Sequence, residues 1–192
     1  MRLFVALDLP EAVRSGLAAV IAKIEPIAPR ASGVRWVRPE ALHVTLKFIG
    51  HIAGERLLDF RAALTPVRSG EPIKLHYRGI GFFPDARRPR VLWCGVQASP
   101  NLAELAAEIE RALEPLGIAR ESRTFVPHLT LARLDSSANV RDLVRAAEGM
   151  EDQDFGAARE TEFHLYESML KTSGAEYRKL ASYSSVKEAR ET

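Results

Sequence analysis

Cysteine is almost absent from this 192-residue sequence, and the single one, Cys94, excludes an internal disulfide. It lies in the apolar run VLWCGV, so we interpret it as a small buried hydrophobic side chain without a catalytic role. Long apolar runs are also absent, since none approaches the roughly 18 residues needed to span a bilayer. The start MRLFVALDLPEAV lacks the basic region and cleavage site of a signal peptide. We therefore expect a cytoplasmic protein that does not associate with membranes.

A large excess of either charge is missing as well. The chain has 27 Lys and Arg against 25 Asp and Glu, a formal net charge of +2. This balance excludes a protein whose overall positive charge coats DNA or RNA of any sequence. Any phosphate binding must therefore come from a small group of side chains at one site. Apolar residues, in contrast, make up 46% of the chain, which is enough for the core of one large or two small domains.

One short pattern, His-apolar-Thr-apolar, occurs twice, as HVTL at residues 43–46 and as HLTL at residues 128–131. From the composition, about 0.04 such tetrapeptides are expected by chance, so two by accident have odds on the order of one in a thousand. The pattern indicates that two related segments serve one purpose.

The segments around the two motifs have the same order of elements, judged by hydrophobic spacing and turn residues. For the first motif we predict a strand at 3–9, a helix through 13–24, a strand at 41–50, a helix around 55–65 and a strand at 73–83. For the second we predict a strand at 91–97, a helix at 99–117, a strand at 124–134, a helix around 139–149 and a strand at 160–170. The two orders match element by element.

We interpret this order as a duplication within a single domain of residues 1–192, with halves at about 1–85 and 90–185. Two such copies predict an α+β protein of two lobes, with mainly antiparallel sheets that face a central cleft. The order of the strands does not follow from the sequence. Because an internal duplication already buries the surface that a homodimer would share, we expect a monomer.

The chemistry of the motifs follows from the alternation of side chains along a strand. His43 and Thr45 point to one face, and the same holds for His128 and Thr130. Two imidazoles in one cleft can provide a neutral base and a protonated acid near neutral pH, and the hydroxyls can bind an anion such as a phosphoryl group. This arrangement suits in-line attack of water on a phosphodiester.

Two other interpretations of the motifs stay open at this point. A duplicated structural strand could carry histidines whose rings are hydrogen-bonded in the core. Two converging histidines could also bind zinc, although the repeated neighbours are threonines rather than a third histidine, a carboxylate or a thiolate.

The motifs and their surroundings resemble a known family. HVTL and HLTL are similar to the paired motifs of the 2H phosphoesterase superfamily. The segments RLFVALDLP, RWVRPEALHVTLKFIG, FPDARRPRVLW, FVPHLTLAR and LYESML resemble its RNA 2′,3′-cyclic phosphodiesterases, historically called 2′-5′ RNA ligases. The resemblance covers roughly residues 1–185. It implies a bilobal fold and metal-independent opening of an RNA 2′,3′-cyclic phosphate to a 2′-phosphomonoester, with no cofactor, and with reversible 2′-5′ ligation as a second activity.

The resemblance also implies roles for single residues. His43 would be the proton donor to the departing O3′, and His128 the proton acceptor that activates water. Thr45 and Thr130 would bind the phosphate oxygens, and Arg133 would contact the substrate, which is an RNA end or a cyclic nucleotide. Strand alternation disagrees about Arg133, which should face away from the two motif residues before it, unless a bulge or the strand end reorients it.

Alternation assigns the residues next to the first motif as well. Lys47 shares the face of His43, where it would add positive charge to the cleft, or else it is a solvated lysine at the strand end. Phe48 falls on the opposite face, where packing in the core is favoured over stacking on a base. Trp36 and Trp93 are also expected in the core.

The remaining candidates have weaker signals. The run DARRPR places three arginines in a loop that could follow RNA phosphates or could simply be solvated: Arg87, Arg88 and Arg90. Three further histidines lack a threonine two residues on: His51, His76 and His164. His76 and His164 occupy corresponding strands, where a structural role is favoured over a place behind the motif residues in the cleft. The sequence assigns no role to His51. Two other functions stay open, an RNA-end binding module without catalysis and an enzyme acting on another cyclic phosphate, such as ADP-ribose cyclic phosphate.

Overall fold

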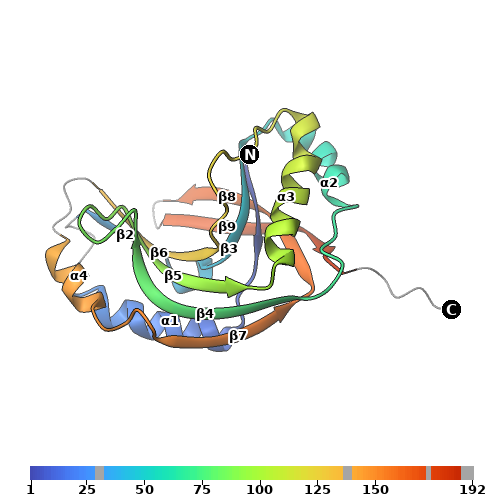
Figure 1. The fold of residues 1–192 in the computed structure, drawn as a ribbon. Coiled ribbons are helices and arrows are strands. Elements are labelled where there is room, and N and C mark those ends of the chain that lie inside the picture. The colour runs from blue at the N-terminus through green and yellow to red at the C-terminus, as the bar shows by residue number, and fades with distance from the viewer. Residues whose placement is uncertain (29–32, 136–139, 172–173, 187–192) are drawn as a thin grey trace.

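The computed structural model describes residues 1–28, 33–135, 140–171 and 174–186 (Figure 1). Its strands are β1 (Arg2–Leu7), β2 (Val34–Trp36), β3 (Val44–His51), β4 (Ile73–Phe83), β5 (Val91–Ala98), β6 (His128–Leu134), β7 (Asp154–Glu160), β8 (Glu162–Lys171) and β9 (Gly174–Ser184). Its α-helices are α1 (Glu11–Ile24), α2 (Leu57–Leu64), α3 (Asn101–Leu113) and α4 (Arg141–Ala147). Short 3-10 turns are η2 (Pro39–Ala41), η3 (Gly54–Arg56) and η4 (Glu114–Leu116). The ten predicted elements are all present, although the expected start of the fourth helix at 139 lies outside the described residues.

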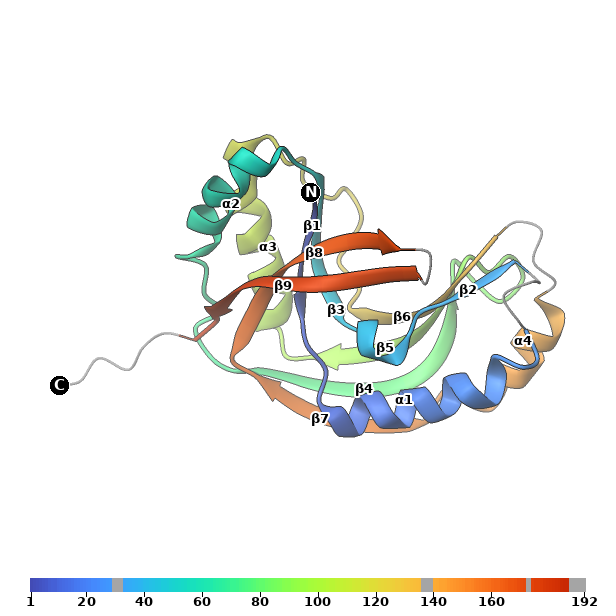
Figure 2. The same ribbon diagram turned by 180° about the vertical axis from the view of Figure 1, so that it is seen from behind.

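The strands form one curved antiparallel sheet with the order β7-β4-β5-β6-β3-β1-β8-β9, and β2 pairs with β6. Two lobes, one of β7, β4, β5, β6 and β2 and the other of β3, β1, β8 and β9, are therefore joined in the middle, where β3 and β6 pair at a single position, Val44 opposite Leu129. Figure 2 shows β8 and β9 crossing above β3 and β6, while α1 runs across the outside of β4 and β7. The predicted α+β fold with two antiparallel lobes around a central cleft is confirmed.

Each lobe contains strands from both predicted halves of the chain. The last strand of the first half, β4, pairs with β5, and β8 of the second half pairs with β1. The helices are exchanged in the same way, since α1 contacts β7 and α4, whereas α3 contacts β3 and α2. The proposed halves 1–85 and 90–185 are therefore interleaved in space, and neither lobe is a contiguous segment.

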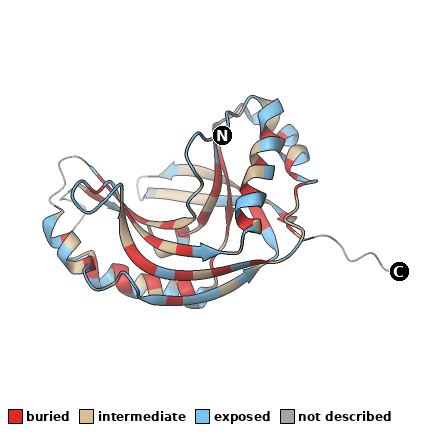
Figure 3. Cartoon of the chain, viewed as in Figure 1, coloured by how far each residue is buried: buried red, intermediate tan, exposed pale blue. Residues whose placement is uncertain are grey.

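The core lies between the convex faces of the sheet and the helices that cover them, as the buried positions in Figure 3 show. The buried residues of α1 repeat at helical spacing and are Val13, Leu17, Val20, Ile21 and Ile24. Cys94 is buried, as predicted. Burial of Trp36 is confirmed, and its Nε1 donates to the carbonyl of Ala28 at 2.9 Å. Trp93 is only half-buried, so the prediction for it was wrong in part: its ring lies over Gly81, on the concave face.

No helix in the described ranges is long and apolar enough to cross a membrane.

Candidate active site

The two motifs meet where β3 and β6 pair, through the apolar residue that follows each histidine. Because the pairing is antiparallel, one step to either side brings Thr45 beside His128 and Thr130 beside His43. All four side chains are half-buried and alternate with fully buried apolar neighbours. The two motifs are thus brought together on one face of the sheet, as the alternation predicts.

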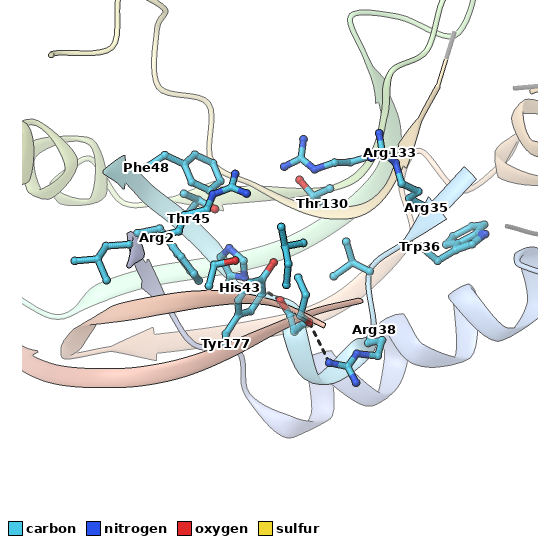
Figure 4. A pocket seen from close by; sticks show the side chains of 17 residues that line it. Arg2, Arg35, Trp36, Arg38, His43, Thr45, Phe48, Thr130, Arg133 and Tyr177 are labelled. Carbon is cyan, nitrogen blue, oxygen red and sulfur yellow. Dashed lines mark hydrogen bonds between the residues drawn. The ribbon is translucent and has the colours of Figure 1, made fainter. Parts of the chain in front are cut away.

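A cavity of about 680 Å³ opens on this face (Figure 4). Its walls include four of the five predicted site residues: His43, Thr45, Thr130 and Arg133. His128 is not in the wall of this cavity and lies at its margin, next to Thr45 in the register. The predicted residues therefore form one cluster with His128 at its edge.

Each motif histidine is held by the carbonyl two residues before it. Nδ1 of His43 lies 2.8 Å from the carbonyl oxygen of Ala41, and Nδ1 of His128 lies 2.8 Å from that of Val126. A carbonyl can only accept a hydrogen bond, so Nδ1 of each ring carries a proton and donates. Nε2 is therefore the nitrogen left to exchange a proton with a substrate.

Aromatic side chains surround the two imidazoles. The His43 ring lies 4.7 Å from the ring centre of Phe4 and edge-on to Tyr177 at 5.1 Å. The His128 ring lies edge-on to Phe83 at 5.0 Å. Such packing restricts the orientation of both rings and excludes water from one side of each.

The charge state of His43 reflects opposing influences. Burial lowers the pKa of its imidazole, and the positive charges of Arg133 and His128 act in the same direction. The hydrogen bond to the Ala41 carbonyl and the negative charge of Asp8 raise the pKa, but the net shift is downward. These influences together favour the neutral ring of His43.

A β-bulge brings Arg133 to the cleft. Between the pairs Trp93–Thr130 and Leu92–Ala132, β6 advances two residues while β5 advances one. Two consecutive side chains of β6 are therefore buried, and Arg133 returns to the face of Thr130. The bulge that alternation required for Arg133 is present.

The first motif carries the same irregularity at the same position. Between the pairs Ala6–Thr45 and Val5–Lys47, β3 advances two residues while β1 advances one. The alternation used for the residues after Thr45 therefore fails. Both predicted faces are exchanged, for Lys47 and for Phe48.

The predictions for Lys47 and Phe48 were therefore wrong, because the bulge in β3 reverses the face of each side chain. Lys47 is 7% exposed and faces α3, where its Nζ donates to Glu110 at 2.6 Å and to the Ala119 carbonyl at 2.8 Å. Neither a cleft cation nor a solvated lysine describes it. Phe48 is 53% exposed and lines the cavity, at the position that corresponds to Arg133 in the other motif.

Replacing Lys47 with methionine is expected to lower the free energy of unfolding by about 1–3 kcal/mol, because Glu110 loses its charged donor in a partly buried site. Urea unfolding monitored by circular dichroism measures this change. Arg120→Met is the matched control, since Arg120 forms an exposed ion pair with Glu114 and should cost less than about 1 kcal/mol. Equal losses in the two variants, or an unchanged midpoint for the first, would contradict the structural role.

The other histidines lie away from the cavity. His51 is exposed at the end of β3, and His76 Nε2 lies 2.9 Å from Asp154 in a shallow groove over β4, β5 and β7. His164 is buried, with its Nδ1 2.9 Å from Ser182 Oγ. The contact of His76 fits a structural role. His164 Nε2 lies 3.5 Å from Asp8, so this histidine is also close to the small pocket that Asp8 shares with His43.

The arginine loop between β4 and β5 is exposed and does not line the cavity. The backbone N–H groups of Arg87 and Arg88 donate to Asp85 Oδ1 at 2.7 and 3.2 Å, which fixes the turn. RNA contact by this loop stays a prediction.

Several residues of the cavity were missed by sequence reasoning. The cations Arg2, Arg35 and Arg38 and the aromatic rings of Phe4 and Tyr177 line it together with the motif residues. Alternation along β1 could have grouped Arg2 with Phe4. Tyr177 carries no such signal, because β9 has no counterpart among the predicted elements.

Within the described ranges, no group of three or more His, Cys, Asp or Glu side chains is placed to hold a metal ion.

A bilobal antiparallel fold in which two His-x-Thr motifs meet at the junction of the lobes defines the class of 2H phosphoesterases. The chain belongs to the 2′-5′ RNA ligase superfamily, whose family model matches residues 13–168.

Relatives of known name cover nearly the whole chain. It is 34% identical over 181 residues to an RNA 2′,3′-cyclic phosphodiesterase of Archaeoglobus fulgidus, which covers 94% of this chain and 98% of that protein. The crystal structure of TT0787 of Thermus thermophilus superimposes with a TM-score of 0.79 at 30% identity, over 98% of this chain and 100% of that one. The E. coli LigT structure with 3′-AMP gives 0.76 at 28% identity, over 95% and 97%.

Proposed function

We propose that this protein is an RNA 2′,3′-cyclic phosphodiesterase that opens the cyclic phosphate to a 2′-phosphomonoester by acid–base catalysis with two histidines and without a metal. The observation that supports this most directly is the pair of imidazoles with equivalent Nδ1 anchors on one face of the sheet. The names of the relatives and the 3′-AMP complex of E. coli LigT support a substrate with a ribonucleotide end.

In the proposed reaction His128 is the base and His43 is the acid. Nε2 of His128 accepts a proton from a water molecule as the water oxygen attacks phosphorus. The bond between phosphorus and O3′ breaks, and Nε2 of His43 donates its proton to O3′. The product has a phosphate on O2′ and a free 3′ hydroxyl. The reverse direction, with the 5′ hydroxyl of a second RNA in place of water, would form a 2′-5′ bond.

The phosphoryl group is proposed to bind between the two threonines. The hydroxyls of Thr45 and Thr130 donate to its non-bridging oxygens, and the guanidinium of Arg133 neutralises the charge that develops on them. Phe48, which occupies the position of Arg133 in the other motif, presents an exposed ring on which a nucleobase can stack.

Incubation with an RNA oligonucleotide that ends in a 2′,3′-cyclic phosphate tests the proposal. In the presence of EDTA we expect conversion to a 2′-phosphate end, because both proton transfers use side chains rather than a metal-bound water. Chromatography against authentic 2′- and 3′-phosphate standards identifies the product. A 3′-phosphate product, or activity that disappears with EDTA and returns with a divalent ion, would contradict the mechanism.

Two other activities of the same site are separated by the same assay. Tight binding of the RNA end without turnover would identify a binding module. Turnover of ADP-ribose cyclic phosphate with a much higher kcat/KM than the oligonucleotide would identify another cyclic phosphate as the substrate. The paired titrating groups favour catalysis, because a binding module needs no second imidazole at the equivalent position.

A further inference from the structure

The two catalytic candidates share a motif but have different neighbours in the sheet. In the pairing of β1 with β3, Leu7 lies opposite Val44. One residue forward along β1 and one residue back along β3, just beyond this last pair, Asp8 and His43 are the next positions of the antiparallel register. Asp8 and His43 also line the same small pocket of about 180 Å³, which shares Phe4, His43 and Tyr177 with the main cavity. A carboxylate therefore accompanies the first histidine.

The equivalent position in the other motif is a glycine. In the pairing of β5 with β6, Gly95 lies directly opposite His128. A Cβ atom built on Gly95 would lie 2.6 Å from the carbonyl oxygen of Arg78 and 3.1 Å from the Trp93 ring. The backbone there excludes any side chain, so the second histidine has no carboxylate at this place.

Asp8 is held in its ionised form. Burial opposes its ionisation most strongly, but hydrogen bonds from Lys179 and Tyr166 and the nearby charge of His164 bring its pKa below the usual value. The Lys179 Nζ lies 2.6 Å from Oδ2, and the Tyr166 hydroxyl donates to Oδ1. The carboxylate is thus fixed in position and negatively charged around neutral pH.

We propose that Asp8 is the positioning residue that makes His43, rather than His128, the acid of the reaction, by placing a fixed negative charge beside that imidazole alone. The inference rests on the proposed function and extends it. A buried acid needs such a charge, since burial and Arg133 both disfavour the imidazolium form of His43. The identical motifs thereby acquire different roles from a difference outside both of them.

The other charged and titratable groups around His43 come from several elements packed against it. Around the ring and its small pocket these are Arg133 and His128 of β6, Tyr177 and Lys179 of β9, Tyr166 and His164 of β8, Arg14 of α1 and Glu40 of η2. Arg14 is engaged with the carbonyls of Leu9 and Pro39. Among these groups Asp8 is the one whose negative charge raises the pKa of His43.

The dependence of kcat/KM on pH tests the proposal with two variants that should shift the profile in opposite directions. The alkaline limb reports the group that must be protonated, and the acidic limb reports the base. Asp8→Asn should move the alkaline limb to lower pH by about one unit, because an adjacent opposite charge is lost. Lys179→Gln should move the same limb to higher pH, because Asp8 then acts without its counter-charge. Glu167→Gln is the control and should move neither limb. It removes an ion pair with Arg178 that joins β8 and β9, the strands that carry Tyr166 and Lys179.

Direct titration of His43 by nitrogen-15 NMR gives a readout that does not need turnover, with the signal assigned by its absence in His43→Ala. Asp8→Asn should lower the measured pKa of His43. An unchanged pKa, a shift of the acidic limb instead, or shifts of the same sign in Asp8→Asn and Lys179→Gln would overturn the inference. If the wild-type protein does not hydrolyse the cyclic phosphate, the proposed function fails and the titration alone decides the role of Asp8.

Discussion

Replacement of either His43 or His128 with alanine is expected to lower kcat by about 10²–10⁴-fold, because each variant loses one of two positioned proton-transfer groups. The two variants should differ in how their remaining activity depends on pH. Wild-type protein should give a bell-shaped profile, His43→Ala should lose the alkaline limb, and His128→Ala should lose the acidic limb. Initial rates on a cyclic-phosphate oligonucleotide between pH 5 and 9, roughly the range in which histidine titrates, measure both effects.

His76→Ala is the matched control for these two variants. His76 is a strand histidine that pairs with Asp154 in another groove, so its removal should leave both limbs in place. Substrate binding by the inactive variants can be followed by fluorescence anisotropy. Full activity of either motif variant would exclude the two-histidine mechanism, and lost binding with retained turnover at saturation would reassign that histidine to substrate binding.

Replacement of Arg133 with alanine is expected to lower kcat/KM by about 10²–10³-fold, the range for loss of a donor that stabilises transition-state charge. Arg133 lies on the cavity face because of the β6 bulge and is close enough to lower the pKa of His43. Arg133→Ala should therefore also raise the pKa of His43. The expected signature is a slower reaction whose alkaline limb lies at higher pH.

Arg133→Lys should recover only part of the rate, because an ammonium group cannot make the paired hydrogen bonds of a guanidinium. Arg120→Ala, which removes an exposed arginine paired with Glu114, is the control for a general loss of positive charge. A similar decrease in both alanine variants would point to long-range attraction of RNA, which high salt would suppress. A decrease confined to Arg133 supports a contact with the phosphoryl group.

Much of the fold could be predicted because its signals are local. Apolar spacing of 3.6 residues identified the helices and alternation identified the strands, so α1 buries the five residues that the spacing indicates. The repeated His-x-Thr pattern identified the centre of the site. The family resemblance then supplied roles for its residues, which neither spacing nor composition could assign.

Alternation failed where a bulge interrupts it. Lys47 and Phe48 were assigned to the wrong faces because the extra residue in β3 depends on how β3 pairs with β1, and the sequence of β3 does not record that pairing. For Arg133, a bulge in β6 was needed to bring its side chain to the face of His128 and Thr130, and the structure has that bulge. One irregularity, repeated in both motifs, explains all three side chains.

By itself, therefore, the sequence determined the element order, the amphipathic faces and the two motifs, because each depends on residues close together in the chain. Tertiary structure alone decided the exchange of strands between the lobes, the two bulges and the contribution of β9 to the cavity. It also decided that Asp8 lies beside His43 while Gly95 lies beside His128. These features depend on which strands pair and in which register, and that is determined by burial of the whole sheet rather than by any local pattern.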